Sequence, residues 1–515
     1  MFVKTFGSAV YGVNAYTITV EVNVSGDGGK FNLVGLPDNA VKESWLRIMT
    51  AFKNNDLRFP RKKVVVNMAP ADIKKEGSAY DLTIATGLLA ASEQMGNAEE
   101  LGKYIIMGEL SLDGGVLPIK GALPIAIQAQ KDGFKGFILP RQNAREASIV
   151  KGLTVYGVEK LSDVVDFFNG QKQLEPVVTD PRADFEDAVN HFDLDFEDVQ
   201  GQENIKRAME IAAAGGHNII LIGPPGAGKT MLAKRLPTIL PPMTLHEALE
   251  TTKIHSVAGK LGENASLLAH RPFRSPHHTI SDVALVGGGQ TPQPGEISLA
   301  HNGVLFLDEL PEFKRAVLEV MRQPLEDRKV NISRARFSVD YPASFMLVAS
   351  MNPCPCGYFN HPEKDCVCGP GIVQKYLSKI SGPLLDRIDI HIEVTPVSFE
   401  ELTSRKRNSE KSEVVRERVQ KARNIQSERF AGKNDVYNNA QMPAHHVKEI
   451  CQISDAGTQL LKTAMQKLNL SARAYDRILK VSRTIADLSE SPEIKIEHLA
   501  EAIQYRSLDR ENWAG

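Results

Sequence analysis

The chain has 515 residues, with 61 lysines and arginines against 63 aspartates and glutamates, and its formal net charge is −2. This length predicts about three domains, each large enough for its own hydrophobic core. The charge balance excludes a globally basic protein, so any contact with nucleic acid must come from local basic patches. No apolar run approaches membrane-spanning length and no cleavable signal is recognisable, so we expect no membrane contact and a cytoplasmic location.

The first part of the chain, residues 1–170, predicts an α/β or α+β domain. Short apolar stretches typical of strands occur at residues 20–24 and 63–67, and helical patterns cover residues 81–92 and 123–131. The following segment, up to residue 197, is acidic and loses this periodicity, which indicates a linker.

A glycine-rich octapeptide beginning at residue 223 matches the G-x-x-x-x-G-K-[ST] pattern of a phosphate-binding loop. Four apolar residues that suit a buried strand precede it, and a helix-forming segment follows it. In such a loop, backbone N–H groups at a helix N-terminus hold a polyphosphate, the lysine reaches the β- and γ-phosphates, and the hydroxyl binds Mg²⁺. The predicted nucleotide-binding residues are Gly223, Pro224, Pro225, Gly226, Ala227, Gly228, Lys229 and Thr230.

Further along the chain, an apolar run over residues 303–307 ends in Asp308 and Glu309. A buried parallel strand reads as continuous hydrophobic residues, and ligands of open α/β sheets bind at the carboxyl ends of the strands. We therefore expect Asp308 to hold Mg²⁺, directly or through water, and Glu309 to polarise the attacking water. Without the phosphate loop, an ordinary strand followed by an acidic turn would be the preferred interpretation.

Four of the five cysteines lie close together, immediately after Asn352, as two C-x-C pairs. Four thiolates satisfy a tetrahedral Zn²⁺ without a catalytic opening, which indicates a structural site made of Cys354, Cys356, Cys366 and Cys368. His361, between the pairs, is an alternative ligand. Because C-x-C is tighter than the usual C-x₂-C spacing, unmetallated thiols or a redox pair remain the other interpretations.

The succession of motifs resembles the AAA+ ATPases, in particular the magnesium-chelatase-like group that includes the ComM/YifB proteins, over nearly the whole chain. This resemblance implies a P-loop α/β core with a helical lid. Residues 199–202 are similar to the segment that packs near the adenine. Residues 345–352 resemble the strand with the sensor-1 residue, so Asn352 would orient the attacking water beside the γ-phosphate.

Two arginine motifs also carry the resemblance. Residues 382–389 resemble the segment with the arginine finger, so Arg387 would complete a neighbouring subunit's site. Residues 471–477 resemble the sensor-2 helix of the lid, with Arg473 the better candidate and Arg477 the alternative. A guanidinium aimed at the γ-phosphate stabilises charge that develops there, and such fingers contribute roughly 10³–10⁵ in rate. An arginine that acts in trans requires a ring or filament, and the relatives imply a homo-oligomeric ring, a hexamer.

Two insertions depart from a minimal AAA+ core. Residues 271–301 resemble the helix-2 insert of this group, with a Gly-Gly-Gly-Gln290 stretch. Residues 327–340 fit a hairpin before sensor 1 that carries four basic residues, Arg328, Lys329, Arg334 and Arg336. In related ring motors both insertions project into the pore, where alternating basic residues could follow a phosphate backbone. A solvated hairpin face is the alternative.

Residues 107–119 resemble the core of Lon-type protease domains, an S5-like α+β fold whose chemistry uses a Ser–Lys dyad. Leu123 stands where that family has its lysine, and Ser78 falls one place early. Lys120 and Ser78 are the remaining candidate pair, but a scaffold or substrate-engaging domain is the favoured interpretation.

The sequence thus predicts an ATPase with ATP and Mg²⁺ as cofactors, and the resemblance implies that it is a ring motor. The resemblance adds DNA, branched or single-stranded, as the substrate of a branch-migration helicase in recombination and natural transformation. A magnesium-chelatase-type ATPase and a protein-remodelling ATPase are the alternatives. Beyond the linker we expect an ATPase core over 198–396, a charged helical connector over 397–440 and a helical lid over 441–515.

Overall fold

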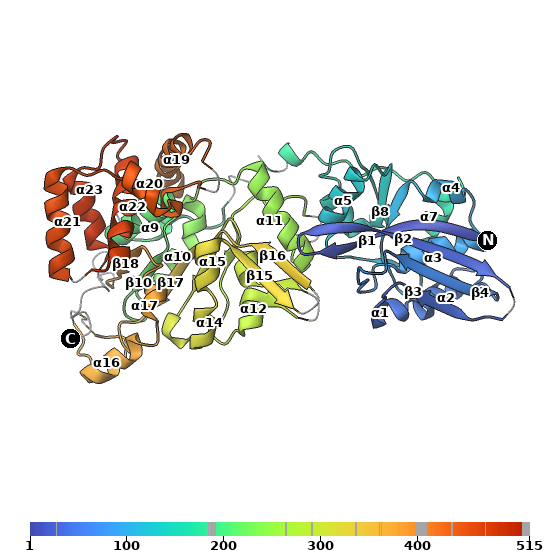
Figure 1. The fold of residues 1–515 in the computed structure, drawn as a ribbon, viewed down its shortest axis with the longest axis horizontal. Helices are drawn as coiled ribbons and strands as arrows, with labels where there is room; N and C mark the ends of the chain where they lie inside the picture. Colours follow the sequence, from blue (N-terminus) through green and yellow to red (C-terminus); the bar gives the residue numbers. More distant parts are fainter. Residues whose placement is uncertain are drawn as a thin grey trace.

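The computed structural model describes all residues except 27, 184, 186–191, 263–264, 290–291, 335–336, 360, 362, 397–408, 434–435, 469 and 507–515. The chain forms an elongated series of units (Figure 1). The N-terminal sheet lies at one end, a second sheet lies in the middle, and a group of C-terminal helices lies at the other end.

A mixed seven-stranded sheet forms the N-terminal unit. Its order is β3 (Phe31–Val34), β4 (Lys63–Ala69), β2 (Asn14–Ser25), β1 (Phe2–Tyr11), β5 (Tyr104–Ile106), β8 (Gly136–Pro140) and β9 (Thr154–Val158). A short ribbon, β6 (Glu109–Leu110) with β7 (Val116–Leu117), stands beside it. Buried and more exposed residues alternate along β2, as expected for a strand with one face on a core.

The central helix of this unit is α3 (Asp81–Ala91), all of whose residues are buried. It is apolar all round, which is why it packs inside the domain, against β1 and β2, rather than on its surface. The other helices are α1 (Asn39–Lys42), α2 (Ser44–Asn54), α4 (Ala98–Leu101), α5 (Ala122–Lys131), α6 (Arg141–Ala147) and α7 (Leu161–Phe168).

The middle unit is a five-stranded parallel sheet. Its order is β11 (Phe273–Arg274), β14 (Val304–Leu307), β17 (Met346–Met351), β10 (Ile219–Ile222) and β18 (Ile390–Glu393). The inner strands β10, β14 and β17 are buried along their whole length, which explains their unbroken apolar sequences. Helices α9 (Glu203–Gly215), α10 (Lys229–Ile239) and α11 (Leu245–Ala258) belong to this unit, with shorter helices α14 (Arg315–Glu319), α15 (Arg322–Asp327), α16 (Pro370–Leu377) and α17 (Gly382–Leu385).

Both predicted insertions contain regular structure. The first forms α12 (Asp282–Val286), the ribbon β12 (Gly287–Gly288) with β13 (Gln293–Pro294), and α13 (Glu296–Leu299); Gln290 lies outside the described residues. The second is a hairpin of β15 (Lys329–Arg334) and β16 (Phe337–Pro342).

The segment predicted as a charged helical connector, residues 397–440, contains a helix that packs into the core. Residues 397–408 lie outside the described part, but α19 (Ser412–Arg429) packs against α9, α10 and α22 (Ala472–Leu488). Its charged residues conceal an apolar stripe at helical spacing, Val415, Val419 and Ala422, which is buried in the shared core. The remaining C-terminal helices are α20 (Ala444–Ile450), α21 (Asp455–Leu468) and α23 (Ile496–Gln504).

The predicted linker also ends earlier than residue 197. Phe196 is buried in the core of the middle unit, and its backbone N–H donates to the hydroxyl of Ser412 at 2.7 Å. The middle unit therefore includes Phe196, a residue that the sequence analysis assigned to the linker.

The N-terminal and middle units are in contact. Helix α5 packs along α11, and Gly121 N–H donates to the carbonyl of Ser256 at 3.1 Å. The β1–β2 turn reaches the insertion hairpin, where the hydroxyl of Tyr11 donates to the carbonyl of Ser338 at 3.4 Å. No described helix is both long and apolar enough to cross a membrane.

Candidate active site

The phosphate-loop sequence folds into a loop between β10 and α10, as its glycine spacing predicts. Gly226 and Gly228 have φ angles of +80° and +84°, a backbone region that residues with a Cβ rarely adopt. A Cβ on Gly223 would lie 2.3 Å from the carbonyl oxygen of Val394, at the end of the neighbouring strand β18. These glycines therefore permit both the turn and its close packing on the sheet.

Lys229 lies folded over the loop at the start of α10. Its Nζ donates to the carbonyl oxygens of Gly223 at 2.6 Å and Pro224 at 2.9 Å, and to Oδ1 of Asn352 at 3.1 Å. Burial lowers the pKa of this lysine, and the nearby Asp308 and Glu309 act in the opposite direction. The structure thus brings the loop lysine and the sensor-1 residue predicted from the sequence into direct contact.

Thr230 and Asp308 form a pair of hard oxygen donors. The Thr230 hydroxyl donates to Oδ2 of Asp308 at 2.7 Å, and Oδ1 of Asp308 accepts from the Ser350 hydroxyl and from the backbone N–H of Glu309. A hydroxyl and a carboxylate held side by side next to a phosphate loop suit Mg²⁺, which prefers oxygen ligands. Ser350 was not predicted from the sequence, although it lies two residues before Asn352 on β17 and so faces the same side of the strand.

The predicted water-activating carboxylate, Glu309, lies at the end of β14 with its side chain 58% exposed. Its backbone is left-handed, with φ of +54°, which is uncommon for a residue with a side chain and marks a sharp turn. Its Oε2 lies 3.5 Å from Nδ1 of His278. The sequence analysis did not single out this histidine.

Gln202 connects the segment before α9 to the phosphate loop. Its side-chain amide donates to the carbonyl of Ala227 at 2.9 Å and to that of Thr395 at 3.2 Å. The residues predicted to lie near the adenine therefore do touch the loop.

Arg387 lies on the side of the sheet away from its own phosphate loop. It precedes β18, and its backbone carbonyl accepts a hydrogen bond of 2.9 Å from the side-chain amide of Asn218. Asn218 directly precedes β10. The phosphate loop follows the other end of β10, four residues and about 13 Å of strand away. Arg387 is therefore positioned to act outside its own nucleotide site, as a finger in trans requires.

The Arg387 guanidinium is nearly buried, with 9% of its side chain exposed. It pairs with Glu326 and donates to the carbonyl of Pro383 at 2.5 Å. It forms part of the wall of a hollow of about 540 Å³, together with residues of α12 and α15.

The two candidate sensor-2 arginines have different surroundings. Arg473 is 66% exposed, and its Nη1 lies 3.1 Å from Oδ2 of Asp386. Arg477 lies 2.9 Å from Oδ1 of the buried Asp389, whose other oxygen lies 3.1 Å from His217. Burial acts to raise the pKa of Asp389, but Arg477 and His217 hold it well below its usual range. Arg477 is thus part of a buried ion pair, and the exposed Arg473 lies beside the Arg387 segment.

The four clustered cysteines converge on one point. Their Sγ atoms all lie within 4.8 Å of one another, and three pairs, among Cys354, Cys356 and Cys366, are separated by 3.3–3.7 Å. Four thiolates around Zn²⁺ would have edges of about 3.8 Å. His361 has another role, since its Nδ1 accepts backbone N–H groups of residues 363 and 364 at 3.0 and 3.1 Å.

The cysteine loop also touches the phosphate loop. A Cβ on Gly357, whose φ is +85°, would lie 2.5 Å from Cδ of Pro225. The cysteine loop therefore packs on Pro225 from one side, and its first cysteine follows Asn352, the predicted sensor-1 residue, by two positions.

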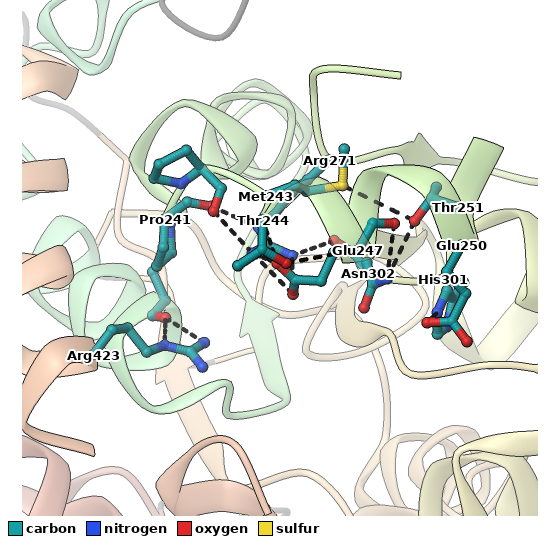
Figure 2. Close-up of polar contacts among 12 residues, drawn as sticks. Pro241, Met243, Thr244, Glu247, Glu250, Thr251, Arg271, His301, Asn302 and Arg423 are labelled. Atoms are coloured by element: carbon teal, nitrogen blue, oxygen red, sulfur yellow. Dashed lines mark hydrogen bonds and ion pairs between the residues drawn. The ribbon is translucent and has the colours of Figure 1, made fainter. Parts of the chain in front are cut away.

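A network of hydrogen bonds and an ion pair lies at the amino ends of strands β11 and β14, at the end of the sheet away from the phosphate loop (Figure 2). Arg271, just before β11, donates to the carbonyls of Pro241 and of Asn302, both at 2.7 Å, and pairs with Glu247 of α11 at 3.3 Å. Asn302, just before β14, in turn donates to the hydroxyl of Thr251 at 3.2 Å. The spacing of β11 and β14 is thus fixed from α11.

The predicted basic stripe on the insertion hairpin is only partly described. Arg336 lies outside the described residues, and so does the side chain of Arg334. On the described part, Lys329 pairs with Asp340 at 3.7 Å, so that section of the exposed face carries both signs of charge.

The N-terminal residues considered for proteolysis have separate partners. Ser78 donates to the carboxylate of Glu109, whereas Lys120 lies against Gly259 at the end of α11. Leu123, at the lysine position of Lon-type domains, is fully buried in α5.

The contacts of Lys229 and of the Thr230–Asp308 pair, at one end of a parallel α/β sheet, are those of an AAA+ ATPase that uses ATP and Mg²⁺. Comparison with family models agrees. Residues 195–402 match "Magnesium chelatase, subunit ChlI", residues 20–143 match "Subunit ChlI of Mg-chelatase", and residues 409–506 match "Magnesium chelatase, subunit ChlI C-terminal".

Relatives that match over nearly the full length of the chain show which family of AAA+ ATPases it belongs to. The chain is 46% identical over 509 residues to competence protein ComM of Haemophilus influenzae, covering 98% of this chain and 97% of the relative. It is 43% identical to the uncharacterized protein YifB of Escherichia coli, covering 98% and 96%. The chain therefore belongs to the ComM/YifB family of magnesium-chelatase-like proteins, as predicted from the sequence.

Similarity to Lon proteases is also found over part of the chain. Lon protease 2 of Bacillus subtilis is 33% identical over 189 residues, covering 31% of this chain and 33% of the relative. The predicted fold class, an AAA+ core with a helical lid behind a Lon-protease-like domain, is thus confirmed.

Proposed function

We propose that this ATPase assembles into a ring, a hexamer, and uses ATP hydrolysis to act on branched or single-stranded DNA as a branch-migration helicase. The proposal of a ring is supported by Arg387, which lies a strand length away from its own phosphate loop; we infer that it serves another subunit's nucleotide. Arg473, beside Asp386, would approach the same neighbouring site.

The proposed roles follow from the contacts. ATP with Mg²⁺ supplies the phosphoryl group to be transferred and a cation that neutralises its charge. Lys229 would exchange the loop carbonyls for the phosphates, while Thr230 and Asp308 hold the metal ion. Glu309 would polarise the attacking water, and Asn352 would orient that water.

DNA as the substrate rests on the full-length relative, which is named a competence protein, and on the insertion hairpin. Competence concerns the uptake of DNA, so we infer a role in recombination during natural transformation. ATP and chromosomal DNA are both present in the cytoplasm, and clustered thiols suit a reducing compartment, so we place the activity there.

We also propose that Cys354, Cys356, Cys366 and Cys368 hold a structural Zn²⁺. The convergence of four thiols and the engagement of His361 elsewhere support a four-cysteine ligand set. The ion would hold the loop that braces Pro225.

The test is ATP hydrolysis measured with no addition and with branched DNA, duplex DNA, single-stranded DNA or an unfolded protein. We expect branched or single-stranded DNA to stimulate turnover most. Stimulation by the unfolded protein alone would favour a protein-remodelling ATPase, and insertion of Mg²⁺ into a porphyrin by this chain with partner subunits would favour a chelatase. Glu309→Gln, which should retain bound ATP without turnover, controls for contaminating ATPases.

A further inference from the structure

The turn between β1 and β2 extends from the N-terminal unit onto the middle unit (Figure 1). Tyr11 at the end of β1 lies opposite Asn14 at the start of β2, so Gly12 and Val13 form a two-residue hairpin loop. Such loops need a positive φ, which Gly12 supplies with +62°. Loop tips usually lie on the surface, but Gly12 is buried. Another part of the chain therefore covers this tip.

The insertion hairpin, β15 with β16, covers it. A Cβ on Gly12 would lie 2.7 Å from Cγ1 of Val339, closer than two carbon atoms approach, so only glycine fits against β16 here. The hydroxyl of Tyr11 donates to the carbonyl of Ser338 at 3.4 Å. Val13 packs against the apolar cluster that contains Val339. Three consecutive residues of the turn thus contact the hairpin or the cluster beneath it.

This apolar cluster joins the two insertions. The hairpin contributes alternate residues from one face, Val330, Ile332, Val339 and Tyr341. The first insertion contributes Leu285 of α12 and Ile297 of α13. The Tyr341 hydroxyl also donates to the carbonyl of Pro292, next to β13, at 2.8 Å. The two insertions are therefore packed as one body, and the β1–β2 turn caps it.

The hairpin depends on this packing for its order. A hairpin of two strands is at best marginally stable by itself, so its conformation is set by what its apolar face and its edges contact. Part of that contact comes from another domain, through Gly12 and Val13. A binding element that is already ordered loses less conformational freedom when it binds, and so binds more tightly.

We propose that the β1–β2 turn is the surface by which the Lon-protease-like domain holds the insertion hairpin in place, and that it pre-organises the hairpin for binding DNA. This gives the N-terminal domain a role in substrate binding that needs no catalytic residue of its own. The binding of DNA rests on the proposed function, whereas the restraint of the hairpin does not.

The test uses the full-length protein with two contact variants and one control. Gly12→Asn adds a Cβ where Val339 lies, while asparagine tolerates a positive φ and so preserves the turn. Val13→Ser removes the apolar cap without adding a clash. Gly26→Asn is the matched control: Gly26 lies just beyond the other end of β2 with φ of +68°, and a Cβ there would meet no described heavy atom within 4 Å.

Hydrogen exchange, measured by mass spectrometry on peptides from residues 329–342, reports the restraint directly. We expect exchange about tenfold faster than in the wild type for Gly12→Asn and Val13→Ser, and unchanged exchange for Gly26→Asn. The concentration of a synthetic branched DNA that half-maximally stimulates ATP hydrolysis should rise about fivefold in the two contact variants. Their unstimulated kcat should stay within about twofold, because the turn lies outside the nucleotide site.

Unchanged hairpin exchange in both contact variants would overturn the restraint. Faster exchange with an unchanged DNA requirement would overturn the pre-organisation. Faster exchange throughout the ATPase domain, with a parallel fall in unstimulated kcat, would mean general destabilisation and would also overturn the proposal. If DNA does not stimulate the wild type, the proposed substrate is contradicted, while the exchange rates still decide whether the turn restrains the hairpin.

Discussion

The N-terminal and ATPase domains differ in whether their candidate catalytic side chains contact one another. Both retain a recognisable fold, but in the Lon-protease-like domain a buried Leu123 occupies the lysine position, and Ser78 bonds to Glu109. In the ATPase domain, by contrast, Lys229 contacts Asn352 and Thr230 contacts Asp308. A shared fold does not by itself imply a shared chemistry, so function has to be argued from side chains that meet.

The Lon-protease-like domain is tied to the ATPase domain. Its helix α5 lies along α11, and its β1–β2 turn contacts the insertion hairpin through Tyr11 and Ser338. Helix α11 in turn carries Glu247, which pairs with Arg271 just before β11. The N-terminal domain therefore contacts both the hairpin and the frame of the nucleotide site, which suits a scaffold.

The largest effect should come from Lys229→Ala. Removal of the cation that faces the phosphates should abolish ATP binding and reduce hydrolysis to background. Lys234→Ala, an exposed lysine on the same helix α10, is the matched control and should behave as wild type. Measurable ATP affinity in Lys229→Ala would contradict the role of this lysine in nucleotide binding, and with it the contrast between the two domains.

Arg387→Ala should lower hydrolysis by about 10³-fold while ATP binding persists, if the arginine acts on a neighbour's γ-phosphate as proposed. Mixed rings of Arg387→Ala and Lys229→Ala subunits should regain activity, since each variant supplies what the other lacks. Arg322→Ala, at the same hollow but paired with Glu319, controls for local damage. No recovery on mixing, with intact assembly, would contradict action in trans.

Removal of zinc should have an intermediate effect. We expect about one zinc per chain in reduced protein, measured by elemental analysis, for a site with four thiolate ligands. Stripping with a chelator, or Cys356→Ser, should weaken ATP binding a few-fold, because the loop against Pro225 loses its brace. Cys451→Ser, buried elsewhere in the C-terminal helices, should keep its zinc. Less than about a tenth of an equivalent in protein never exposed to chelator would refute the site.

The smallest effect should follow changes in the N-terminal pair. Ser78→Ala with Lys120→Ala should leave ATP hydrolysis within about twofold, since neither side chain approaches the nucleotide. The wild type and the double variant should cleave an unfolded protein substrate equally little, measured by release of acid-soluble fragments. Serine-dependent cleavage by the wild type would remove the contrast between the domains.

Local sequence determined the family, the fold class, the phosphate loop and the strand that ends in Asp308, because glycine spacing and apolar runs have the same meaning wherever they occur. It also indicated the cysteine cluster, whose ligands lie within a few residues of one another. It misjudged α19, because sparse apolar residues among many charges conceal a buried stripe until the partner helices are known.

Only the tertiary structure decided which distant residues meet. The packing of the sheet places Arg387 at the end away from its own phosphate loop, and it brings Gly357 of the cysteine loop against Pro225. Each of these depends on pairings between segments far apart in the chain. Their geometry is set by packing of the whole sheet, so no local pattern encodes it.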